Sequence, residues 1–117
     1  MAKNDMEVIM YKILRYMYEC MKVGKRLELL DMCYKCKMFE IPELYWNQII
    51  LELIEAGYVR GFLKGDTKDG LTITMLDSAA ITLEGVRFLE ENSRMVKSRQ
   101  FLGKGFEVAL DTILKAL

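Results

Sequence analysis

The sequence predicts one α+β domain, mostly helical, in which a three-helix bundle carries a β-hairpin and a further amphipathic helix follows at the C-terminus. Two patterns support this prediction: apolar residues recur at helical spacing in several segments, and a stretch rich in turn formers separates two segments that favour strands. The 117 residues suit one hydrophobic core. We therefore expect a single domain over residues 1–117, with its C-terminal helical extension at about 97–117.

Periodicity and end signals mark the first three helices. Apolar residues repeat at steps of three and four over residues 6–21, and Gly24 gives the chain a place to leave the first helix. A shorter helix is expected from about Leu27 to Lys37. Pro42 suits the first position of the third helix, whose apolar period runs to Gly57. The apolar side of the second helix would hold Leu29, Leu30, Cys33 and Cys36.

The hairpin and the last two helices follow in order. Residues 58–63 and 71–76 favour strands, and residues 64–70 between them are dense in turn formers. Thr82 is expected to cap a helix that ends near Asn92. The last helix would carry one apolar stripe, formed by Leu102, Phe106, Ala109, Leu110, Ile113, Leu114 and Leu117.

Three helices, a hairpin and a fourth helix, in this order, form the winged-helix arrangement. The stretch from Ala80 to Asn92 (AITLEGVRFLEEN), placed after a hairpin, resembles the YjcQ-like family of small bacterial and prophage proteins. The resemblance extends over nearly the whole chain and includes Ile54 to Val59 (IEAGYV). It implies a winged-helix fold and no established activity, and it provides no catalytic or ligand-binding residue to carry over.

Composition narrows the function classes. The 17 basic and 17 acidic side chains cancel, so no global field draws the chain to nucleic acid or to a membrane surface. Lys12, Arg15 and Glu19 interrupt the early apolar stretch, which predicts no signal peptide, no membrane association and a cytoplasmic location. With no histidine, the chain lacks the most common general base, and we expect no enzymatic activity.

The three cysteines leave two interpretations open. Cys33 and Cys36 would share a helix face, where two thiolates can bind a soft metal or form a redox pair. A closed zinc site needs about four ligands, and only Cys20 could join them. We favour buried thiols that serve as small core residues, and we expect neither a metal nor a cofactor.

The third helix and the hairpin are candidates for binding double-stranded DNA. Against this, residues 42–56 contain Glu43, Glu52 and Glu55 and no lysine or arginine, a charge that phosphates would repel. The leading hypothesis is a DNA-binding regulator of transcription, and the alternative is an adaptor that meets an unidentified protein partner. Base edges would meet Tyr45, Asn47 and Gln48, and phosphates would meet Arg60, Lys64 and Lys68.

The apolar stripe of the last helix also suggests a homodimer, because a small bundle has limited room for it. Packing of the stripe onto the chain's own bundle is the alternative. The residues assigned to dimerisation are Leu102, Phe106, Leu110, Ile113, Leu114 and Leu117.

Overall fold

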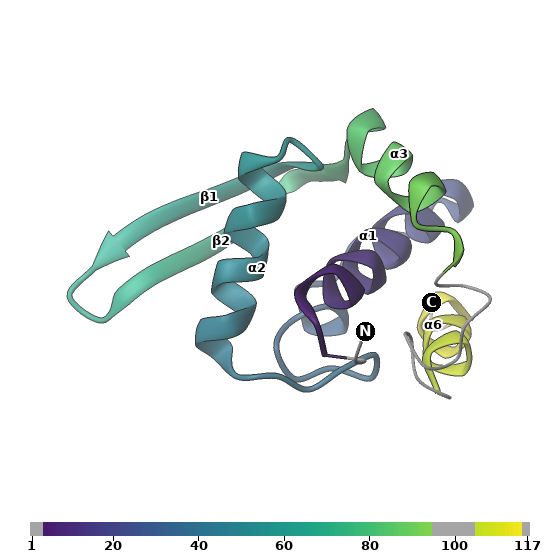
Figure 1. The fold of residues 1–117 in the computed structure, drawn as a ribbon, viewed down its shortest axis with the longest axis horizontal. Helices are drawn as coiled ribbons and strands as arrows, with labels where there is room; N and C mark the ends of the chain where they lie inside the picture. The colour runs from purple at the N-terminus through teal and green to yellow at the C-terminus, as the bar shows by residue number, and fades with distance from the viewer. Residues whose placement is uncertain (1–3, 95–104, 116–117) are drawn as a thin grey trace.

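The computed structural model describes residues 4–94 and 105–115. Helices pack into a bundle, and a long two-stranded ribbon, the wing, projects from it (Figure 1). This is the α+β architecture predicted above. The elements are α1 (Met6–Val23), η1 (Leu29–Asp31), α2 (Glu43–Glu55), β1 (Val59–Thr67), β2 (Gly70–Ile81), α3 (Leu83–Glu91) and α6 (Phe106–Lys115).

Helix α1 is the centre of the core. It contacts α2, α3, α6 and β2, so most of its circumference is buried. Val8, Ile13 and Tyr16 have no exposed surface at all, although they lie at different angles around the helix. The helix ends as predicted, because Gly24 adopts a left-handed φ of 75° and donates its N–H to the carbonyl of Met21.

The predicted second helix, from Leu27 to Lys37, is wrong. The segment makes only the short turn η1 and then runs irregularly, and Leu30 is 81% exposed. Its backbone hydrogen bonds do not follow the helical pattern, because the Cys36 N–H donates to the carbonyl of Phe39, a later residue, at 3.0 Å. The core takes Met32, Met38 and Phe39 instead, whereas Leu29, Cys33 and Cys36 of the predicted apolar side are only partly buried.

The wing is longer than predicted, with a tight turn at residues 68–69 between Thr67 and Gly70. Its antiparallel pairing is regular from that turn to the pair formed by Phe62 and Met75, and it resumes where Arg60 pairs with Ala80. Between these pairs β1 contributes only Gly61, whereas β2 contributes residues 76–79. The extra residues form a bulge at the base of the wing, close to the bundle.

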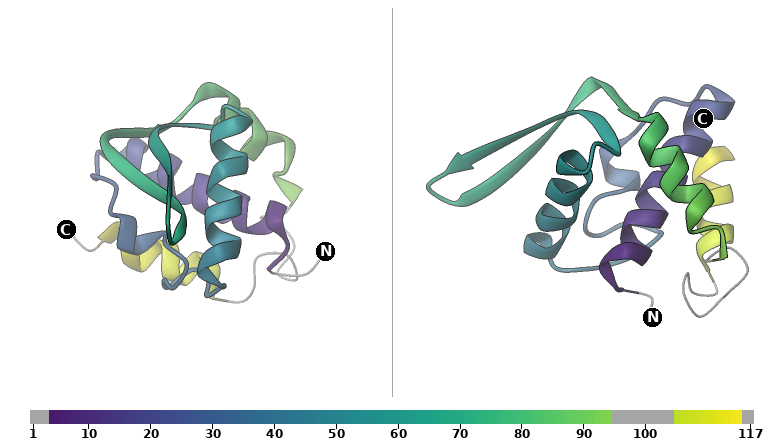
Figure 2. Two further views of the ribbon diagram at one scale, coloured as in Figure 1. Left: turned by 90° about the vertical axis from the view of Figure 1, so that its left-hand side faces the viewer. Right: turned by 45° about the horizontal axis from the view of Figure 1, so that its top comes forward.

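The last two helices cover α1 (Figure 2). Thr82 caps α3 as predicted, because its side-chain oxygen accepts the N–H of Gly85. Phe88 and Leu89 of α3 are buried. Helix α6 packs on α1 and is fixed there by an ion pair of Arg15 with Glu107 at 3.0 Å.

Candidate nucleic-acid interface

Helix α2 is anchored in the bundle by one side and exposes the other. Trp46 and Leu53 lie on the buried side, and the Trp46 indole N–H donates to the carbonyl of Met32 at 2.8 Å. Leu44, Gln48 and Glu52 follow one another at steps of four and share an exposed side. Leu44 is 76% exposed, a feature that sequence analysis did not single out although its position off the apolar stripe could have revealed it.

Asn47 does not belong to this exposed side. Its side chain is only 8% exposed, and its amide nitrogen donates to the carbonyl of Leu71 on β2 at 3.3 Å. The predicted contact of Asn47 with base edges does not fit this burial, because the side chain instead links α2 to the wing. The signal for this role was absent from the sequence, because the acceptor is a backbone group 24 residues away.

Tyr45 and Gln48 flank that link in the first half of α2. Gln48 is exposed. Tyr45 is partly buried, and its hydroxyl donates to the carbonyl of Asn4 at 2.8 Å. Partial burial raises the pKa of Tyr45, and the nearby carboxylate of Asp5 adds to the effect, so the phenol stays protonated and can donate at neutral pH.

The wing holds the three cations predicted to contact phosphate. Arg60, Lys64 and Lys68 are all exposed. Lys64 lies 4.0 Å from the carboxylate of Glu55, an exposed pair that holds the lysine weakly. Neither Arg60 nor Lys68 forms an ion pair with any residue that the structure describes.

The acidic residues of α2 divide between its two ends. Glu43 begins the helix and Glu55 ends it, with Glu52 one turn before the end. In helix-turn-helix proteins the N-terminal part of the recognition helix meets the bases. Glu43 lies at that N-terminal part, Glu52 shares the exposed side of Gln48, and Glu55 is 4.0 Å from Lys64, so all three carboxylates oppose an approaching phosphate.

Cys20 and Cys36 are shielded from solvent to different degrees. Cys20 is buried in the core, and burial raises the pKa of its thiol. Burial also raises the pKa of Cys36, so both groups favour the protonated form, which is a poor metal ligand and a poor nucleophile. Among residues 4–94 and 105–115, no cluster of three or more acidic, cysteine or histidine side chains could hold a metal ion.

The C-terminal stripe is occupied within the chain. Phe106, Leu110 and Ile113 are each 2% exposed in the core, and Leu114 packs against the same cluster. Packing onto the chain's own bundle, the alternative considered above, therefore describes these residues. Leu114 is only partly buried, and the homodimer stays a prediction. Leu102 and Leu117 lie outside the described residues.

A helix mounted on a bundle and followed directly by a projecting ribbon is the architecture of the winged-helix class. The family model described as YjcQ protein matches residues 11–103, and the chain belongs to this family. The match ends before α6 begins. No curated protein and no solved structure matches the chain. Within the described residues, no helix has both the length and the apolar character needed to cross a bilayer.

Proposed function

We propose that this protein binds double-stranded DNA with the first half of α2 and the wing, and thereby influences transcription. The observation that carries the proposal is the hydrogen bond from Asn47 to Leu71, which fixes the tip half of the wing beside the first half of α2. A helix and a ribbon held in one orientation can follow a groove and its adjacent backbone together.

The side chains divide into two roles. The exposed amide of Gln48 suits adenine, which offers an acceptor and a donor at matching spacing in the major groove, and the Tyr45 hydroxyl, whose proton is donated to Asn4, can accept from a base donor. Arg60, Lys64 and Lys68 supply the charge that phosphates require. Asn47 acts on DNA through the wing and not by contact.

Fluorescence anisotropy with labelled duplex DNA tests the proposal. Affinity should fall steeply as salt rises, and Arg60→Ala with Lys68→Ala should weaken binding to all sequences and reduce the salt slope by about two. A matched control, Arg87→Ala with Lys115→Ala, removes two exposed cations that pair with neighbours on α3 and α6. Binding that is undetectable, insensitive to salt, or weakened equally by the control pair would contradict the proposal.

A second candidate, an adaptor for a protein partner, is favoured by a separate observation. The exposed side of α2 combines a 76% exposed Leu44 with Gln48 and Glu52. An exposed apolar residue beside carboxylates suits a partner with a basic, partly apolar surface better than it suits phosphate. No lysine or arginine on α2 offsets these carboxylates.

A photo-crosslinking amino acid at position 44 separates the two candidates in cells that produce the protein. Adducts removed by nuclease support DNA binding, and adducts removed by protease alone support the adaptor. The same group at Val108, which is 69% exposed on α6, is the control for random collisions.

A further inference from the structure

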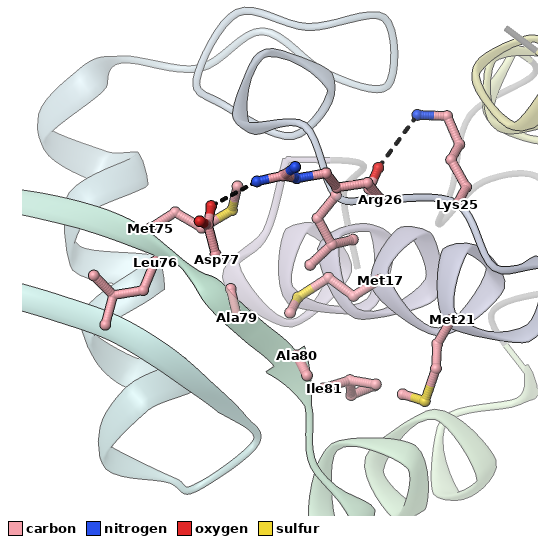
Figure 3. A pocket seen from close by; sticks show the side chains of 11 residues that line it. Met17, Met21, Lys25, Arg26, Met75, Leu76, Asp77, Ala79, Ala80 and Ile81 are labelled. Carbon is pink, nitrogen blue, oxygen red and sulfur yellow. Dashed lines mark hydrogen bonds and ion pairs between the residues drawn. The ribbon is translucent and has the colours of Figure 1, made fainter. Parts of the chain in front are cut away.

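A cavity lies at the base of the wing, between α1, the loop after it and the bulge of β2. Its volume is about 220 Å³. Met17 and Met21 line it from α1, whereas Ala79, Ala80 and Ile81 line it from β2 (Figure 3). This size is below the roughly 300–1,000 Å³ of cavities that hold drug-sized ligands, so it suits a smaller molecule.

The part of the wall formed by α1 and its facing residues is apolar and adaptable. Met75 and Leu27 join the two methionines of α1, and thioether side chains reshape easily around an apolar guest. Met17 is 1% exposed, whereas Met21 is 51% exposed, so the wall runs from the core to the surface. An aliphatic chain or a small ring can lie along this wall, with one end in the core and the other at the surface.

The rim of the cavity carries charge. Arg26 extends from the loop and its Nη2 lies 2.7 Å from Oδ1 of Asp77 on the bulge (Figure 3). Both side chains are largely exposed, at 75% and 92%, so the pair is weakly held and a competing carboxylate can replace Asp77 at the guanidinium. Lys25 also lines the cavity, but its Nζ pairs with Asp31 at 3.6 Å, so Arg26 is the cation at the rim that a guest can meet.

The bulge of β2 forms one wall of the cavity. Residues 76–79 leave the ladder between the pairs that flank Gly61 and supply part of the lining. Gly61 permits this bulge, because it has a φ of +80° and an added Cβ would lie 2.5 Å from the backbone of Ala79. A regular ribbon would place no bulge over Met17, and the cavity would lose that wall.

We propose that this cavity is a binding site for a small amphipathic carboxylate, whose apolar body lies among Met17, Met21 and Met75 and whose carboxylate pairs with Arg26. The geometry of the site requires neither DNA nor a protein partner. A bound ligand would join α1 and its following loop to the base of the wing.

Methyl resonances of ¹³C-labelled methionine provide a direct readout, and hexanoate is the probe. Hexanoate should shift the signals of Met17, Met21 and Met75 in a saturable way. The signals of Met32 and Met38, which are buried away from the cavity lining, should stay in place. Hexan-1-ol and hexylamine have the same chain without the carboxylate, and both should bind about two- to fivefold more weakly.

Two variants examine the recognition. Arg26→Gln should raise the dissociation constant of hexanoate about two- to fivefold and leave that of hexan-1-ol unchanged. Ala79→Leu should fill the cavity and abolish the shifts. Arg87→Gln, which removes an exposed, paired arginine on α3, should change nothing. Equal binding of the three probes, shifts spread over all the methionines, or hexanoate binding unaffected by Arg26→Gln would overturn the proposal.

Discussion

Substitution of Gly61 by alanine tests the account of the bulge directly. The residue has a φ of +80°, where a side chain is strained, and its added Cβ would lie 2.5 Å from both N and Cα of Ala79 and 2.7 Å from the carbonyl carbon of Ser78. These neighbours are backbone atoms, so no side chain can rotate out of the way. Either the bulge moves or the strands separate at the base of the wing.

The magnitude follows from comparison with Gly57. Gly57 has a similar φ of +76°, but an added Cβ would meet no atom within 4 Å. Gly57→Ala therefore costs only the left-handed strain, about 1–2 kcal/mol, less a few tenths recovered from the unfolded chain. Gly61→Ala adds the cost of overpacking, about 1–3 kcal/mol, which gives a total loss of about 2–5 kcal/mol.

Urea unfolding followed by far-UV circular dichroism measures both losses. The difference between the two variants isolates the contact with the bulge, because the backbone strain is nearly common to both. Equal free energies of unfolding for Gly61→Ala and Gly57→Ala would refute the close approach of β1 to the bulge, and with it the description of the cavity wall.

Three further predictions concern the bundle. Leu110→Ala should lower the free energy of unfolding by about 2–5 kcal/mol, because the Leu110 side chain is only 2% exposed. Val108 is 69% exposed, so Val108→Ala should change the free energy of unfolding by less than about 0.5 kcal/mol. Urea titration measures both changes. Thr82→Ala should cost about 1 kcal/mol in the same assay through loss of the α3 cap, and Thr82→Ser should recover most of it. Burial raises the pKa of both Tyr16 and Cys20, so at alkaline pH the folded chain retains protons that the unfolded chain releases. The free energy of unfolding should therefore fall as the pH rises above about 9. A constant free energy of unfolding up to pH 11 would contradict this prediction.

The sequence correctly predicted the helix ends that depend on one residue and its immediate neighbours. Gly24 and Thr82 mark helix ends through their own backbone and side-chain chemistry, and both act as expected. The segment from Leu27 to Lys37 failed because its apolar residues fit a helix in isolation, whereas the core selected Met32 and Phe39. A pattern this short cannot distinguish the two, since tertiary contacts decide which residues are buried.

In the candidate interface, too, the sequence predicts features set by nearby residues but not those set by contacts between distant segments. The exposure of Gln48 follows from helical spacing along the chain, and that of the wing cations follows from their charge. The role of Asn47 depends on where β2 returns, and the cavity depends on the offset of residues 76–79 from Gly61. Register offsets of this kind come from pairing between distant segments, which composition and periodicity do not encode.

The indole of Trp46 gives the protein an internal optical probe. It is the single tryptophan of the chain, it is 5% exposed, and its N–H is bonded to Met32 in the irregular segment. Its fluorescence should therefore be blue-shifted in the folded state and should report when that segment leaves α2. Time-resolved emission can then compare local opening of the segment with global unfolding in one sample, without an added dye.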